Sequence, residues 1–135
     1  MKNLLFSLFL LLSINIFGQS LEEDFKNQIK NQTIVGKSIK GRQVIYTFAQ
    51  NGNTAILRDN TGRYNHEFIK MCGDIAIYKE YHVFNIFYTG FQINGDTIYV
   101  TSNNDIGGLK LKKDNNIPQQ IAEELPSKAL SFVFK

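Results

Sequence analysis

The sequence predicts a mainly β protein: a small antiparallel meander that closes as a barrel or curled sheet. Residues alternate between apolar and polar with period two over most of the chain. Asn-Gly and Gly-Gly turn sequences separate about eight short strands, and short connections imply antiparallel neighbours. A long meander hides its edges by closing into a barrel or folding into a sandwich. Helical patterns lie before the first strand and before the last one.

The first eighteen residues are typical of a secretory signal peptide. Lys2 precedes an apolar stretch from Leu4 to Leu12, and we expect cleavage after Gly18. The stretch is too short for a membrane span, which takes about 20 residues. We therefore expect residues 19–135 to form one β-rich domain, exported to the periplasm or the cell exterior. The only cysteine is Cys72, so no lipid anchor is predicted.

A helix is predicted over residues 21–31. Ser20 and Glu23 have the spacing of a capping box, with the serine at the N-cap. Leu21, Phe25 and Ile29 recur every four residues and form one narrow apolar stripe. The stripe indicates that this helix covers the sheet.

The strands follow with their turns. Strand patterns cover residues 44–49, 54–58, 63–70, 75–79, 81–93, 98–100, 109–112 and 130–135. Turns are predicted at residues 50–53, 59–62, 73–74, 94–95 and 107–108. Gly90 lies inside the long run 81–93 and predicts a bulge there. Between Pro118 and Pro126, the residues Ile121, Ala122 and Leu125 predict a short C-terminal helix.

Composition excludes several function classes. The formal net charge of +3 is too small for a nucleic-acid footprint, so no nucleic-acid partner is expected. Lys37, Lys40 and Arg42 form a cluster that is expected to be a solvated face. No phosphate loop, dinucleotide fingerprint or nucleophile elbow occurs, so no cofactor is predicted.

Catalytic and metal sites are also not expected. Cys72 with His66 or His82 is the conceivable nucleophile–base pair, but no catalytic-cysteine signature surrounds it. His66, Cys72, Asp74 and His82 lack the paired spacing of zinc ligands. We expect Cys72 to be buried and inert, and we do not expect an enzyme.

Aromatic residues gather between residues 78 and 91. Core packing is the first explanation for this density, and the lining of a ligand pocket is the second. The candidate ligand-binding residues are Tyr78, Tyr81, Phe84, Tyr88 and Phe91.

The order of a strand meander, a C-terminal helix and a last strand resembles that of lipocalins. The segments Thr47–Thr54 and Phe91–Val100 are similar to hairpins of short bacterial lipocalin-like domains. The Gly-x-Trp motif usual in lipocalins is absent, because the chain has no tryptophan. The resemblance implies a small binding module for an apolar ligand. The alternative is a secreted or envelope protein-interaction module, such as an inhibitor or a structural protein, without a ligand pocket. The apolarity of both faces of the predicted 81–93 strand favours this alternative.

Overall fold

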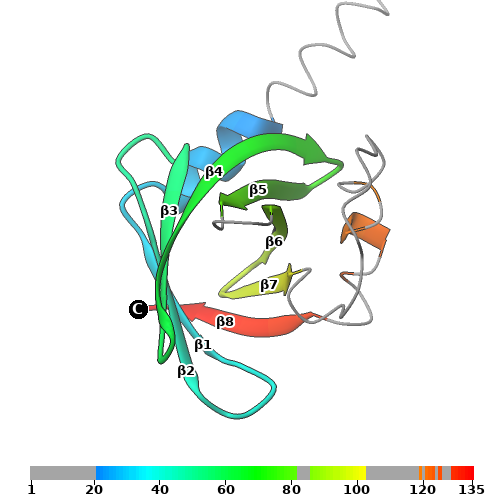
Figure 1. Cartoon of the computed structure of the whole chain (residues 1–135). Coiled ribbons are helices and arrows are strands. Elements are labelled where there is room, and N and C mark those ends of the chain that lie inside the picture. The colour runs from blue at the N-terminus through cyan, green and yellow to red at the C-terminus, as the bar shows by residue number, and fades with distance from the viewer. Residues whose placement is uncertain (1–20, 82–85, 103–118, 120, 124, 126–128) are drawn as a thin grey trace, which may run out of the picture.

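A closed barrel of eight antiparallel strands forms the body of the protein (Figure 1). The computed structural model describes residues 21–81, 86–102, 119, 121–123, 125 and 129–135. The strands are β1 (Thr33–Lys37), β2 (Gln43–Phe48), β3 (Thr54–Asp59), β4 (Gly62–Cys72), β5 (Ile75–Tyr81), β6 (Ile86–Asn94), β7 (Thr97–Ser102) and β8 (Leu130–Phe134). The predicted mainly β class, with its antiparallel meander, is confirmed, and the sheet closes as a barrel.

Each strand pairs with its neighbours in the chain, and β1 also pairs with β8. Ile34 lies opposite Phe134, and Gly36 lies opposite Phe132. This last pairing closes the sheet, so none of the eight described strands has an open edge. The predicted turns at residues 50–53, 59–62, 73–74 and 94–95 all join adjacent strands.

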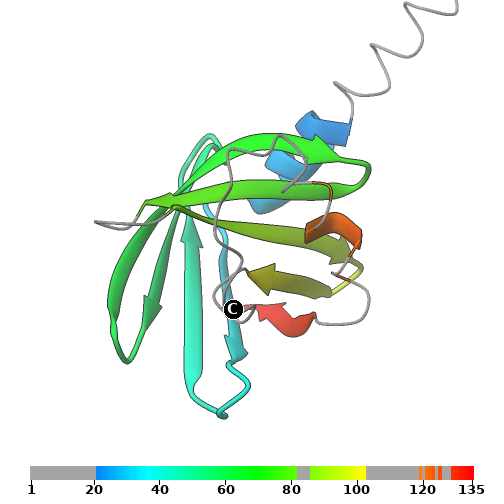
Figure 2. The same cartoon turned by 45° about the vertical axis from the view of Figure 1, so that its right-hand side comes forward.

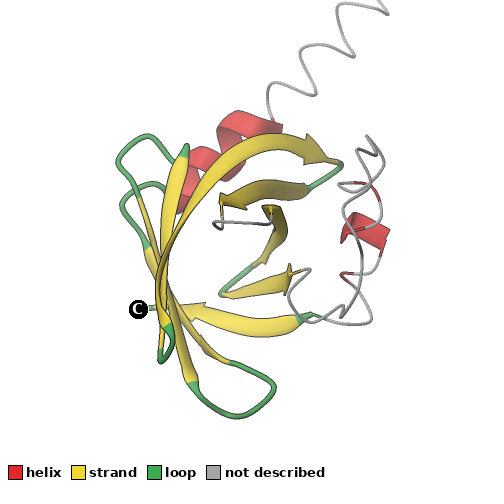
Figure 3. Cartoon of the chain, in the orientation of Figure 1, coloured by secondary structure: helices red, strands yellow, loops and turns green. Residues whose placement is uncertain are grey.

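The predicted N-terminal helix is present over residues 21–29 (Figure 3). Its apolar stripe faces the barrel, because Phe25 and Ile29 are buried in the same core as the inward-facing strand residues. Asn31 has a positive φ of 59°, a conformation that ends helices, and its N–H donates to the carbonyl oxygen of Ala49. The helix therefore covers the barrel end at which the β2–β3 turn lies.

The predicted C-terminal helix lies on the outside of the barrel (Figure 3). Its residues Ile121 and Leu125 are buried against Ile75 and Ile77, which point outward from β5. Gly90 explains this close packing, since a Cβ atom there would lie 2.9 Å from Ile121 Cγ2. The predicted bulge at Gly90 is wrong: β5 and β6 pair in continuous register there, and the bulge lies between Phe68 and Lys70 of β4.

Two strand predictions need correction. The run 81–93 is not one strand, because Tyr81 ends β5 and pairs with Ile86 at the start of β6. Aromatic and β-branched residues continue on both sides of this break, so the sequence pattern does not separate the two strands. Strand β1 is not predicted as a separate element. The predicted strand 109–112, the predicted turn 107–108 and the predicted signal peptide lie outside the described residues.

Both faces of β6 are covered by the chain itself. Phe91 is fully buried in the barrel core, and Tyr88 packs on the outer cluster beneath the C-terminal helix. The apolarity of both faces therefore does not require an external partner. No helix in the described part of the chain is long and apolar enough to cross a membrane.

Candidate functional site

Three polar side chains are buried inside the barrel wall. His66 comes from β4, Glu80 from β5 and Thr89 from β6, and none exposes more than 1% of its surface. His66 and Glu80 are direct cross-strand partners, and Thr89 lies opposite Tyr78, one inward position away from Glu80. Strand alternation points all three inward, because their neighbours in sequence point to the outer face. We call His66, Glu80 and Thr89 the polar trio.

The contacts of the polar trio converge on one atom of the imidazole ring. His66 Nε2 lies 3.4 Å from Glu80 Oε2 and 3.3 Å from Thr89 Oγ1. The other ring nitrogen, Nδ1, lies 3.4 Å from the carbonyl oxygen of Tyr64, which can only accept a hydrogen bond. An Nδ1–H group can donate a hydrogen bond to that oxygen, and Nε2 faces both the Glu80 carboxyl group and the Thr89 hydroxyl group.

Aromatic rings surround the polar trio on the side of the N-terminal helix. The Tyr46 ring meets the His66 ring edge to face, with centroids 5.5 Å apart. Tyr46 also contacts Phe91 and Phe132, and Phe91 in turn contacts Phe48 and Tyr78. These rings fill the half of the barrel nearest the helix. The polar trio therefore lies at the border between this aromatic core and the other half.

The opposite end of the barrel carries the β1–β2 and β3–β4 turns and the end of β5, and we call it the mouth (Figure 2). Inward positions near the mouth are only half-buried. They are Gly36, Val44, Tyr64, Phe87 and Leu130. Phe87 lies directly opposite Glu80. The inward positions between the mouth and the polar trio are thus apolar or aromatic.

Of the five predicted ligand-binding residues, the structure describes the side chains of three, and it brings two of them together. Tyr78 and Phe91 point into the barrel and are fully buried. Tyr88 lies on the outer face, where it packs beneath the C-terminal helix. The side chain of Tyr81 and the whole of Phe84 lie outside what the structure describes.

Tyr78 has a structural role within this arrangement. Its hydroxyl donates a 2.6 Å hydrogen bond to the carbonyl oxygen of Gly52 in the β2–β3 turn. Its ring contacts Phe25 of the N-terminal helix, with centroids 6.3 Å apart. Burial raises the pKa of the Tyr78 hydroxyl well above its ordinary value, because the ionised form would lose its hydration.

The structure does not bring together His66 and Cys72. His66 points into the barrel, whereas Cys72 is half-buried in the outer cluster near the C-terminal helix. His82 lies outside the described residues. Among the described residues, no group of three or more His, Cys, Asp or Glu side chains could hold a metal ion.

The polar trio was not identified from the sequence, although one signal for it exists. Tyr64, His66 and Phe68 share one face of their strand, so His66 is a polar residue in an apolar row. That position alone does not reveal a partner. The register of β4 against β5 brings Glu80 opposite His66, and this register follows from pairings along the whole barrel.

Comparison of the chain with protein-family models, curated proteins and solved structures found no match.

Proposed function

We propose that the protein is a small binding module whose barrel takes up an apolar ligand through the mouth. The observation that carries the proposal is the polar trio, a buried carboxylate and imidazole among aromatic rings. Burying such groups costs several kcal/mol by general estimates, whereas apolar residues of similar size would often be neutral or stabilising. Ligand pockets combine apolar walls with a few polar groups in this way.

The fold is compatible with this function. Eight-stranded antiparallel barrels have an interior that either fills with side chains or holds one small ligand. Here the aromatic core occupies the half beneath the N-terminal helix, and the inward residues near the mouth are half-buried. We place the apolar part of the ligand along Val44, Tyr64 and Leu130. One polar group of the ligand then reaches the polar trio.

The first experiment compares the native and denatured masses of protein recovered from cells that express the full chain. An additional mass that disappears on denaturation identifies a bound small molecule and supports the proposal. The denatured mass also tests the predicted cleavage after Gly18. A protein that is recovered bare, and that also fails to bind the apolar fluorophore N-phenyl-1-naphthylamine, contradicts the proposal.

A matched pair of variants locates the site. In the double variant His66→Leu/Glu80→Leu, apolar side chains replace the imidazole and the carboxyl group of the polar trio. We expect it to fold and to lose at least tenfold in affinity for whichever compound the wild-type protein carries. Tyr99→Phe, a change in the outer cluster, should leave that affinity unchanged. Equal affinity in the double variant and the wild type would show that the polar trio is not the ligand contact.

A further inference from the structure

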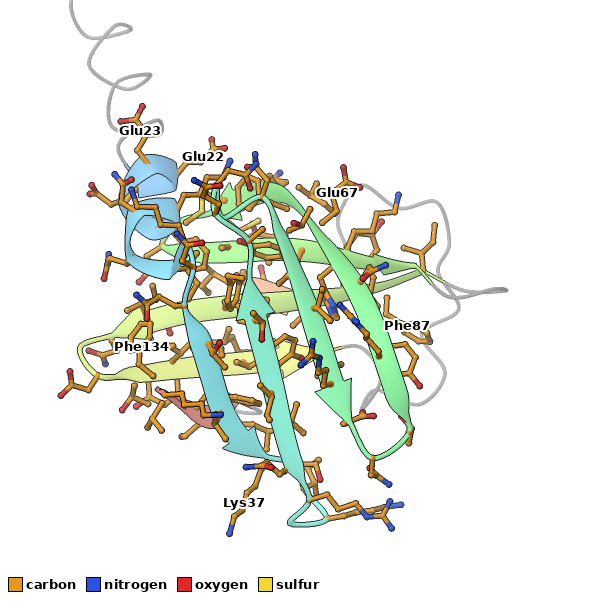
Figure 4. The ribbon with its side chains drawn as sticks, turned by 90° about the vertical axis from the view of Figure 1, so that its left-hand side faces the viewer. Glu22, Glu23, Lys37, Glu67, Phe87 and Phe134 are labelled. Atoms are coloured by element: carbon orange, nitrogen blue, oxygen red, sulfur yellow. The ribbon has the colours of Figure 1, made fainter. Side chains whose placement is uncertain are left out.

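Among the described residues, exposed cations gather at the mouth of the barrel. At the mouth, the ends of β1 to β4 and their turns carry five exposed cations and one carboxylate among residues 37–42 and 58–63. The cations are Lys37, Lys40, Arg42, Arg58 and Arg63. Acidic residues gather at the helix end instead, and Figure 4 shows Glu22, Glu23 and Glu67 on the opposite side of the barrel from Lys37.

Little within the described chain offsets the charge at the mouth. The one carboxylate, that of Asp59, accepts hydrogen bonds from the Thr61 N–H, the Thr61 hydroxyl and the Gly62 N–H. This carboxylate therefore already accepts hydrogen bonds from its own turn. Arg58 and Arg63 are direct cross-strand partners on the outer face, and like charges placed opposite each other destabilise a sheet.

An exposed apolar side chain lies among these cations. Ile39 is at the tip of the β1–β2 hairpin and exposes 74% of its surface, more than the other exposed large hydrophobic residues of the described chain. The tip is ordered: Gly41 N–H donates to the Ser38 carbonyl oxygen, and Ser38 N–H donates to that of Arg42. Gly41 has a positive φ of 75°, as a three-residue hairpin loop of this kind requires. The fold therefore holds Ile39 outward.

We propose that the mouth docks on an anionic lipid surface, with Ile39 inserted at the interface and the five cations facing the headgroups. Lysine and arginine near an anionic membrane are attracted to it, and an apolar side chain among them adds burial in the interface. An acidic protein would satisfy the cations but gives no reason for a protruding isoleucine. The inference concerns the outer surface and holds whether or not the interior binds a ligand.

Co-sedimentation with lipid vesicles tests the docking. Protein recovered from cells that express the full chain is mixed with phosphatidylcholine vesicles, with or without an equal share of phosphatidylglycerol. We expect binding to the anionic vesicles only, weakening as salt is added. Neutralising two cations in Lys40→Gln/Arg42→Gln should reduce the partition coefficient by about 25-fold, since each contributes about fivefold. The matched variant Lys30→Gln/Lys70→Gln makes the same change in net charge on exposed residues at the helix end, and should bind within about twofold of wild type.

Substitutions of Ile39 distinguish insertion into lipid from general binding to polyanions. Ile39→Ser keeps every charge and should reduce the partition coefficient by at least about tenfold, the low end of the range for burying such a side chain. Because the chain has no tryptophan, Ile39→Trp also supplies a unique reporter. Its emission should shift to shorter wavelength with anionic vesicles, whereas the emission of Val133→Trp on the outer wall should not.

Three results would overturn the proposal. They are equal binding to the two kinds of vesicle, equal loss in the mouth and helix-end variants, or unchanged vesicle binding by Ile39→Ser. The last result would show that the cations bind the headgroups without insertion of Ile39. The substitutions lie at exposed positions, and a circular dichroism melt of each variant shows whether its fold is retained.

Discussion

The Tyr78 hydroxyl donates a 2.6 Å hydrogen bond to the carbonyl oxygen of Gly52, which joins β5 to the turn beneath the N-terminal helix. A Cβ atom on Gly52 would lie 3.2 Å from the Lys26 Cα, so the helix rests directly on this turn. The buried Tyr78 hydroxyl thereby connects strand β5, the β2–β3 turn and the N-terminal helix. The stability of the helix end therefore depends on it.

Tyr78→Phe should lower the free energy of unfolding by about 1–3 kcal/mol, because it leaves the buried Gly52 carbonyl without its donor. Urea denaturation followed by circular dichroism measures the change. Tyr88→Phe is the matched control on the outer face and should change stability by less than about 0.5 kcal/mol. Equal effects of the two substitutions would contradict the role given to Tyr78.

Alkaline pH should destabilise the protein through the same residue. Burial raises the pKa of Tyr78 in the folded state above its ordinary value of 10.0. The hydroxyl is neutral in both states below that value. Above it, the unfolded chain releases a proton that the folded protein retains, so stability falls as the pH rises. The urea midpoint should therefore fall less steeply for Tyr78→Phe than for wild type between about pH 9 and 11. Parallel curves would exclude Tyr78 as the source.

Gly90→Ala should destabilise the protein by about 1–3 kcal/mol, because the new methyl group would lie 2.9 Å from Ile121 Cγ2. A double-mutant cycle with Ile121→Ala checks the cause by urea denaturation. In that background the offending methyl group is absent, so Gly90→Ala should cost less than half as much. An unchanged cost would place the strain elsewhere.

Phe25→Ala should cost about 3–5 kcal/mol of unfolding free energy, since Phe25 is buried between the helix and the barrel core. Gln28→Ala, on the exposed face of the same helix, should cost less than about 0.5 kcal/mol. Thermal unfolding of the two variants measures the difference. If both melt like the wild type, the helix does not stabilise the barrel.

Glu80→Leu alone should be more destabilising than His66→Leu/Glu80→Leu. Removing one partner of a buried polar pair leaves the other polar group unsatisfied and costs about 1–3 kcal/mol, whereas replacing both partners by apolar groups is often nearly neutral. Urea denaturation of the two variants at neutral pH makes the comparison. A double variant as unstable as the single one would mean that the pair stabilises the fold directly.

Local features of the structure could be predicted from the sequence. The helix stripe of Phe25 and Ile29 and the Asn94–Gly95 hairpin depend on neighbouring residues, and both are present. The break after Tyr81 was missed, because the strands on each side of it are rich in aromatic and β-branched residues. Gly90 was misinterpreted because the helix that packs against it lies about 30 residues further along the chain.

The polar trio could not be predicted for a different reason. His66, Glu80 and Thr89 meet through the registers of three strands, and a shift of one residue in any of them would turn its side chain outward. Pairings around the whole barrel fix those registers. Alternation predicts which face a residue takes, but it does not predict its neighbour across the strands.

The pairing of β1 with β8 also has a consequence for how the protein is made. During synthesis β1 is made first, and its partner β8 follows about 100 residues later. The edge of β1 that pairs with β8 therefore stays unpaired until β8 is complete. Contacts so distant in sequence slow folding, and an open strand invites pairing with another chain. A nascent chain truncated before Leu130 would therefore have two free sheet edges, and we expect such fragments to aggregate where the full chain folds.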